Sequence, residues 1–296
     1  AVRKCDGTGY WVVAHSIGNS NFLAFDVTSS GVNTSQIISS VGINHNITGA
    51  SNELNAVGYM KFSADGTKLA LVYRDVDNLT TNGAGAYTYD FDNAMGTVSN
   101  ESHIPGSQNI QSLYGIEFSP DGNQLYIGDV TSVYRADLVL GTPMTLVNST
   151  VPIPNNNVTR SLQIGPDGDM YVSLNNYAFL ARIPNPNSNT AVLNTNAIAL
   201  ASGTNGRFGL PNVVPSLFQP LSNIDLGNDT TYCDIVSQTL DAGGPFASYL
   251  WSDGSTNQTL MVNQPGQYWV QVGENGCFAN DTINIVAIST PTINLP

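Results

Sequence analysis

The chain has 296 residues, of which only 10% are charged, and its formal net charge is −13 with nine Lys and Arg in total. So few basic residues exclude a general attraction to phosphate backbones, and we expect neither nucleic-acid binding nor attachment to an anionic membrane surface. No run approaches the roughly 20 apolar residues that a membrane helix needs, so membrane insertion is not expected either. The 41% of hydrophobic residues is enough for packed cores and excludes general disorder.

A short motif recurs along the first three quarters of the chain. Its copies are Phe62-Ser63-Ala64-Asp65-Gly66, Phe118-Ser119-Pro120-Asp121-Gly122 and Ile164-Gly165-Pro166-Asp167-Gly168, with a fainter one at Asp6-Gly7. Asp-Gly between two apolar runs is typical of a tight β-hairpin turn, because the glycine accepts positive φ and the aspartate bonds back to turn amides.

The spacing of these copies indicates a repeated β unit. The four Asp residues are 59, 56 and 46 residues apart, near the length of a four-stranded propeller blade, and nothing longer than a turn or two shows a helical apolar period. The sequence therefore predicts an all-β chain with about four WD40-like β-propeller blades in residues 1–221.

Two acidic clusters in this region are candidate metal sites. Asp75 with Asp77, and Asp90 with Asp92, offer the oxygen ligands that Ca²⁺ accepts, although their spacing departs from an EF-hand loop. The alternative is that these side chains cap turns. A structural calcium is the only cofactor that we consider.

Candidate catalytic groups are few. Glu53, Glu101 and Glu117 could in principle supply the carboxylate pair of a glycoside hydrolase, but no motif surrounds them. The three histidines, at positions 15, 45 and 103, each stand alone without metal-ligand or triad spacing. We predict a non-enzyme, with a secreted propeller enzyme of the glycoside hydrolase or lactonase type as the alternative.

Residues 222–288 have a different sequence pattern, with short segments of alternating polar and apolar residues separated by Gly, Asn and Pro. This pattern predicts a small β-sandwich with Trp251 and Tyr268 in its core. Cys233 and Cys277 bracket the strands, so we predict a disulfide between them and an oxidising location outside the cytosol. Cys5 is left as a buried thiol or as the partner of a group upstream. Residues 289–296 contain two prolines and are expected to be an extended linker to further domains of the same parent chain.

Residues 226–288 resemble the immunoglobulin-like, PKD-like repeats of very large adhesin-type and gliding-associated proteins exported by the bacterial type IX secretion pathway. The matching residues are Asp229, Thr230, Trp251, Gly254, Tyr268 and Val270. Residues 1–220 resemble the propeller-like region ahead of such repeats, through Tyr10 to His15, the Ser-Pro-Asp-Gly hairpins, Phe91-Asp92-Asn93 with Gly96, and Gly209-Leu210-Pro211-Asn212.

The resemblance implies secretion, attachment to a bacterial cell surface, and further blades before the first one here. It also implies that Thr282, in Asp281-Thr282-Ile283, is a candidate O-glycosylation site. The expected function is that of a non-catalytic segment of a secreted surface protein, which acts in adhesion, in binding surface glycans or proteins, or as a spacer.

Overall fold

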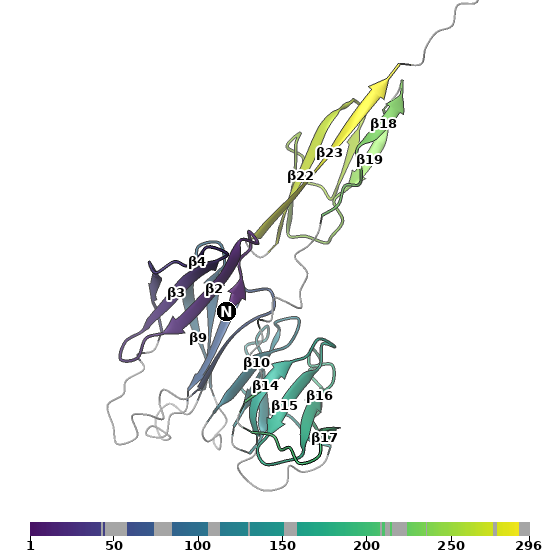
Figure 1. Ribbon diagram of the computed structural model, residues 1–296. Helices are drawn as coiled ribbons and strands as arrows, with labels where there is room; N and C mark the ends of the chain where they lie inside the picture. The colour runs from purple at the N-terminus through teal and green to yellow at the C-terminus, as the bar shows by residue number, and fades with distance from the viewer. Residues whose placement is uncertain are drawn as a thin grey trace, which may run out of the picture. The chain divides into compact units, whose positions relative to one another are not determined.

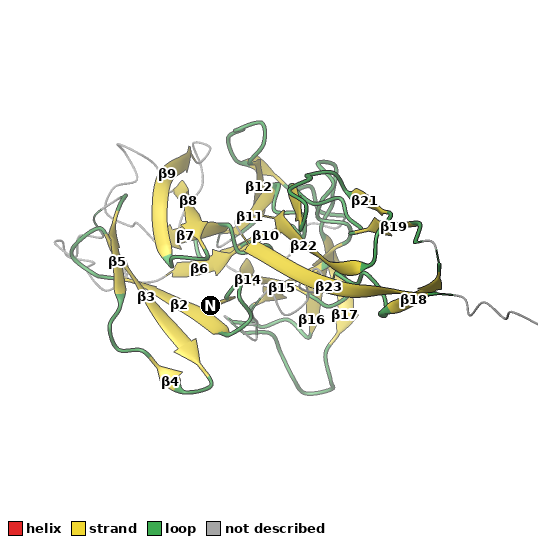
Figure 2. Cartoon of the chain, turned by 90° about the horizontal axis from the view of Figure 1, so that it is seen from above, coloured by secondary structure: helices red, strands yellow, loops and turns green. Residues whose placement is uncertain are grey.

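The computed structural model describes residues 1–42, 44, 58–73, 85–105, 113–129, 131–150, 159–207, 209, 210, 214, 224–234, 236–274 and 277–289. These residues form strands, turns and loops without a helix (Figure 2). It follows that no helix suited to crossing a membrane occurs among them. The chain divides into two compact units, Ala1–Gln219 (unit 1) and Pro220–Pro296 (unit 2). The all-β prediction is confirmed.

The described residues of unit 1 form four antiparallel sheets, each made of strands that follow one another along the chain (Figure 1). Because a β-propeller blade has this meander topology, the unit is propeller-like, and we call the sheets blades 1 to 4. In blade 1, two short segments, β4 and β5, both pair with β3 in place of one fourth strand.

The strands of blade 1 are β1 (Val2–Arg3), β2 (Gly9–His15), β3 (Asn21–Thr28), β4 (Gly31–Val32) and β5 (Ile37–Ser40). Those of blade 2 are β6 (Gly58–Phe62), β7 (Lys68–Tyr73), β8 (Gly85–Asp92) and β9 (Thr97–Pro105). Blade 3 has β10 (Gly115–Phe118), β11 (Gln124–Gly128), β12 (Val133–Asp137) and β13 (Thr145–Leu146). Blade 4 has β14 (Thr159–Ile164), β15 (Met170–Leu174), β16 (Phe179–Ile183) and β17 (Asn194–Ala199).

The Asp-Gly motif forms the turn between the first two strands of each blade. In blade 3 the Ser119 hydroxyl donates to Asp121 Oδ1 at 2.6 Å, and the Asn123 amide donates to the same oxygen at 3.1 Å. The Gly122 amide closes the turn by donating to the Ser119 carbonyl at 2.9 Å, with a glycine φ of 72°. Gly66 and Gly168 have the same role in blades 2 and 4, with φ of 73° and 79°.

The cores of unit 1 lie between blades. Phe22 and Ala24 of blade 1 pack with Leu69 and Tyr89 of blade 2. Two further clusters join blade 2 to blade 3 and blade 3 to blade 4. Each blade is therefore stabilised mainly by its neighbours, since both faces of a strand need apolar cover.

One sheet face of blade 1 differs from its counterparts. When the four blades are aligned on their Asp-Gly turns, Val12 of β2 corresponds to Leu71, Ile127 and Val172. These three residues are buried against the preceding blade. Val12 itself is 41% exposed. Among the described residues, this face of blade 1 has no equivalent cover.

The part of unit 2 that the structure describes has two sheets, which share a buried core. The four-stranded sheet has the order β18 (Thr230–Cys233), β23 (Cys277–Ile288), β22 (Gly266–Glu274) and β20 (Ser248–Trp251). The second sheet pairs β19 (Gln238–Asp241) with β21 (Thr259–Val262). Trp251, Val270 and Ile283 of the first sheet share a buried cluster with Leu240 and Val262 of the second.

The predicted disulfide between Cys233 and Cys277 is wrong. Cys233 is an exposed free cysteine. The reason is the parallel pairing of β18 with β23, which places Cys233 opposite Ile288, whereas Cys277 begins β23 at its other end. Eleven residues of strand span roughly 36 Å, far beyond the ~7 Å between Cα atoms that a disulfide allows. Cys5 is half-buried and is not a free thiol.

Candidate functional site

The first strands of blades 2, 3 and 4 carry polar residues at one equivalent position. Lys61, Glu117 and Gln163 each immediately precede the apolar residue that opens the repeated motif. β10 lies against both β6 and β14, so the three positions are brought together. Side chains alternate between the two faces of a strand, which separates these polar groups from the inter-blade cores.

These three side chains form a buried polar cluster. Lys61 Nζ lies 3.2 Å from Glu117 Oε2 and donates to Gln163 Oε1 at 2.7 Å. Lys61 is 4% exposed and Glu117 is 1% exposed. A buried charge is costly unless it is paired and hydrogen-bonded, and here one ammonium group bonds side chains from two other blades.

The Glu117 carboxylate is also held by the backbone. The Phe118 amide donates to its Oε1 at 3.2 Å, and the Ile164 amide of β14 donates to the carboxylate as well. Burial raises the pKa of Glu117 above its usual range, and the attraction of Lys61 opposes this rise. A raised carboxyl pKa is a property of general acids, but it also results from simple enclosure.

A second polar group lies next to this cluster: Tyr59 and Ser161 stand two residues before Lys61 and Gln163 on β6 and β14, and Tyr114 immediately precedes β10. The ring centroids of Tyr59 and Tyr114 are 5.3 Å apart, and Ser161 is hydrogen-bonded to the Tyr59 side chain. Burial, followed by the effect of Tyr114, raises the pKa of Tyr59. The Leu210 amide donates to Ser161 Oγ at 2.7 Å, and Ser161 is also within 3.1 Å of the Ser173 hydroxyl. Tyr59 and Ser161, like the Lys61 cluster, therefore have hydrogen-bond partners inside unit 1.

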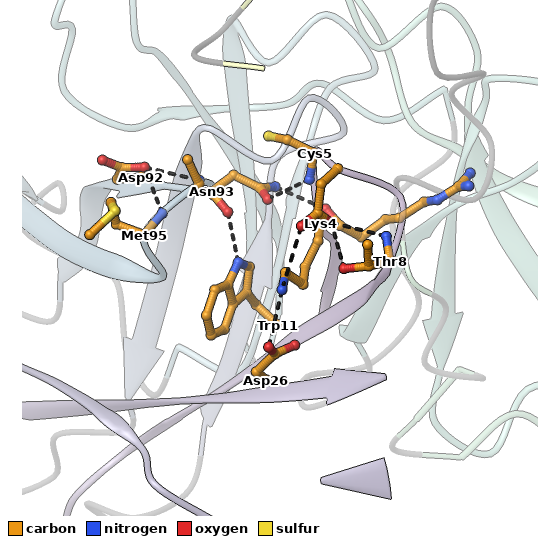
Figure 3. A network of polar contacts seen from close by, with 11 residues as sticks. Lys4, Cys5, Thr8, Trp11, Asp26, Asp92, Asn93 and Met95 are labelled. Carbon is orange, nitrogen blue, oxygen red and sulfur yellow. Dashed lines mark hydrogen bonds and ion pairs between the residues drawn. The ribbon is translucent and has the colours of Figure 1, made fainter. Parts of the chain in front are cut away.

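Asn93, in the turn between β8 and β9, joins blade 2 to the first strand of blade 1 (Figure 3). Its Oδ1 accepts from the Cys5 amide at 3.0 Å, and its Nδ2 donates to the Arg3 carbonyl at 2.9 Å. Lys4 Nζ in turn donates to Asp26 Oδ2 at 3.1 Å and lies 5.0 Å from the Trp11 ring. Every polar atom of the Asn93 side chain therefore has a protein partner.

Aromatic donors connect blades at a repeated position. Trp11 Nε1 of β2 donates to the Asn93 carbonyl at 2.7 Å, and the Tyr126 hydroxyl of β11 donates to the Pro186 carbonyl at 2.8 Å. Trp11 and Tyr126 occupy the same place in blades 1 and 3, and both acceptors lie after the third strand of the next blade. Ala70 stands at this place in blade 2, and the Lys61–Glu117 ion pair connects this blade to blade 3.

The other predicted catalytic candidates that the structure describes have contacts elsewhere in unit 1. Glu101 is exposed on β9 and accepts from the Tyr89 hydroxyl at 2.8 Å. His15 ends β2 against the Phe22 ring, with burial as the main cause that lowers its pKa, and His103 packs against Tyr87. Glu53 and His45 lie outside the described residues.

The predicted calcium ligands fall into two groups. Asp90 bonds Lys68 and Asn100, which lower its pKa, and Asp92 Oδ1 caps the β8–β9 turn by accepting from the amides of Ala94 and Met95. Among residues that the structure describes, no three His, Cys, Asp or Glu side chains are grouped as for a metal ion. Asp75 and Asp77 lie outside these residues, so the calcium site there stays a prediction.

In unit 2, Trp251 is buried and donates from Nε1 to the Asn257 carbonyl at 2.8 Å. Tyr268 is half-buried, and its hydroxyl donates to the Gln264 carbonyl at 2.8 Å. Thr282, the candidate glycosylation site, is exposed on β23 opposite Trp269 of β22. Its side chain is accessible, and its modification stays a prediction.

Sequence reasoning considered Glu117 but missed Lys61 and Gln163. The available signal was positional, because aligning the three motif copies places a cation, an anion and an amide in one column just before Phe62, Phe118 and Ile164. Opposite charges at equivalent positions of neighbouring blades favour an ion pair, as Lys61 and Glu117 form.

No protein-family model and no curated protein matches the sequence. Among solved structures, hydrazine synthase from Kuenenia stuttgartiensis is 12% identical over 60% of this chain and 50% of that chain, with a TM-score of 0.40. A TolB-type protein from Agrobacterium tumefaciens is 15% identical over 95% and 78%, with a TM-score of 0.42. A GH74 enzyme from Niastella koreensis is 17% identical over 62% and 23%, with a TM-score of 0.35. Similarities this weak say nothing about activity, so function has to be argued from the residues.

Proposed function

We propose that this chain is a non-catalytic segment of a secreted bacterial cell-surface protein, which binds surface glycans or proteins and spaces further domains of the same parent chain. The observation that carries the non-catalytic part is the enclosure of Glu117. A general acid must reach its substrate, whereas Glu117 is 1% exposed and is bonded by Lys61 and two backbone amides.

The enzymatic alternative is a glycoside hydrolase or lactonase. The raised pKa of Glu117 favours it, because such an enzyme needs a carboxyl group that stays protonated near neutral pH. It also needs a second carboxylate several ångströms away. The described partners of Glu117 are an ammonium group, backbone amides and, through Lys61, an amide side chain, which supports the structural role instead.

The location outside the cell rests on the resemblance and on composition. A surface that is polar through Asn, Ser, Thr and Gly, with 10% charged residues and net charge −13, suits a protein exposed to a crowded exterior. The immunoglobulin-like assignment of unit 2 belongs to the same proposal. It is supported by two sheets that share a core containing Trp251.

Two assays test the proposal together. The purified chain is screened for hydrolysis of glycosides and lactones, and in parallel for binding to intact bacterial cells and to extracted surface polysaccharide and protein. We expect retention on at least one surface fraction and no turnover above background. Turnover that disappears in Glu117→Gln but persists in the exposed control Glu101→Gln would establish an enzyme and reject the proposal.

A further inference from the structure

The outer face of the four-stranded sheet in unit 2 gathers exposed aromatic and amide side chains. Alternate residues of β22 and β23 point into the core, including Val270, Val272 and Ile283. The residues between them face outward, and Trp269 is 37% exposed among them. A tryptophan left this accessible is notable, because this side chain gains most from burial and from stacking.

Amides and one hydroxyl surround Trp269 in the sheet register. Thr282 lies directly opposite it on β23, while the pairs Gln271–Asn280 and Gln267–Asn284 lie one step to either side. A step of two residues along a strand is roughly 7 Å, and neighbouring strands are about 4.8 Å apart. Hydrogen-bonding side chains therefore lie on both sides of the Trp269 ring. They are close enough to contact a ring-sized ligand that stacks on it.

The exposed apolar residues continue this face in both directions. Leu250 of β20 lies opposite Gln271, and Phe278 lies near the start of β23, opposite Gly273. Val286 is exposed toward the other end of β23. The apolar contacts thus extend along the strand beyond one ring, which fits a chain-like ligand better than a single small molecule.

Charge decides the chemistry of the ligand. Residues 220–296 contain no Lys, Arg or His and seven acidic residues, so an anionic ligand would find no partner and would be repelled. Asp229, at the edge of this face, already binds Asn284 through both oxygens, and Asp281 accepts from the Leu226 amide. Gln267 Nε2 also donates to Asn284 Oδ1 at 3.2 Å, and the remaining polar groups around Trp269 are uncharged donors and acceptors that suit an uncharged partner.

From these observations we infer that the face formed by Leu250, Gln267, Trp269, Gln271, Asn280, Thr282 and Asn284 binds a neutral polysaccharide chain. Trp269 stacks on the C–H face of one sugar ring, and the amides on either side bond hydroxyl groups of that sugar and its neighbours. This inference rests on the proposed function and names its site and ligand class.

The test uses the intact chain in native gels that contain neutral polysaccharides (xyloglucan, mannan, starch or hydroxyethylcellulose) or the anionic polysaccharides alginate and heparin. We expect at least one neutral polysaccharide to retard the chain and the anionic ones not to. Trp269→Ala should weaken the apparent affinity at least about tenfold, and Trp269→Phe should restore part of it. Gln271→Ala should weaken it by a smaller factor.

The matched control is Met261→Ala, since Met261 is exposed on β21 of the other sheet. It should bind like the original chain, and thermal unfolding confirms that each variant is folded. Retardation that is unchanged in Trp269→Ala, or no retardation by any neutral polysaccharide, overturns the inference. Retention on surface protein alone would overturn the inference and leave the proposed function intact. Glu117-dependent hydrolysis together with Trp269-dependent polysaccharide binding would overturn the proposed function and leave the binding site intact.

Discussion

The first strands of unit 1 and the outer sheet face of unit 2 both carry polar side chains at alternate positions, but with opposite outcomes. In unit 1 blades pack on one another, so Lys61, Glu117 and Gln163 are enclosed and bond each other. In unit 2, β19 and β21 cover one face of the four-stranded sheet, and on its other face Trp269 is exposed among the described residues. Side chains alternate along the strand in both units. In unit 1 the polar ones bond one another in the interior, and in unit 2 they lie on an accessible sheet face.

The largest expected loss of stability comes from a substitution that breaks the enclosed cluster. Lys61→Met leaves Glu117 buried without its cation, and we expect a loss of about 3–5 kcal/mol in the free energy of unfolding. Urea unfolding with hydrogen exchange across β6, β10 and β14 measures it. The control Lys61→Met with Glu117→Leu removes both charges and should recover most of the loss. A cost below about 1 kcal/mol for the single variant would show that unit 1 does not depend on this pair.

The next effect concerns the link between blades 1 and 2. Asn93→Ala removes two hydrogen bonds to the Arg3 carbonyl and the Cys5 amide, and we expect a loss of about 1–3 kcal/mol because these backbone groups lose their partner. Hydrogen exchange should accelerate in residues 2–5 before it does so in blade 4. The exposed Asn123→Ala serves as the comparison. Uniform acceleration through all four blades would contradict a local link.

The pH dependence separates burial from ion pairing in the enclosed cluster. Burial raises the pKa of Glu117 in the folded chain, so the stability from this group is fully present below its unfolded pKa of about 4.3 and is lost as the pH rises through the folded value. The unfolding free energy of the original chain relative to Glu117→Gln should therefore fall as the pH rises above about 4. A difference that instead grows with pH would mean that Lys61 outweighs burial.

The smallest effect belongs to the exposed face. Trp269→Ala should cost no more than about 1 kcal/mol in the free energy of unfolding, since Trp269 is 37% exposed and loses mainly cross-strand contacts. Trp251→Ala in the same sheet should cost about 3–5 kcal/mol, because it empties the core of unit 2. Chemical unfolding of unit 2 compares the two variants. Similar losses from both would place Trp269 among the structural residues and weaken its assignment as a binding group.

Local chemistry was readable from the sequence, and long-range pairing was not. The Asp-Gly turns at Asp65, Asp121 and Asp167 were predictable because residues close together in the sequence form them. The error at Cys233 arose because cysteine spacing does not reveal that β18 runs parallel to β23 and meets its far end. The partners of Glu117 were missed for a related reason, since Lys61 and Gln163 are separated from it by whole blades.

Polar bonds of unlike kinds connect successive blades in unit 1. Trp11 donates to the Asn93 carbonyl, Lys61 pairs with Glu117, and Tyr126 donates to the Pro186 carbonyl. If blades 2 and 3 were exchanged, Tyr126 and Ala70 would change places. The Tyr126 hydroxyl would then no longer meet the Pro186 carbonyl, which is its acceptor in blade 4. The blades are thus repeats in topology but not interchangeable modules, and their order along the chain is encoded in these unlike connections.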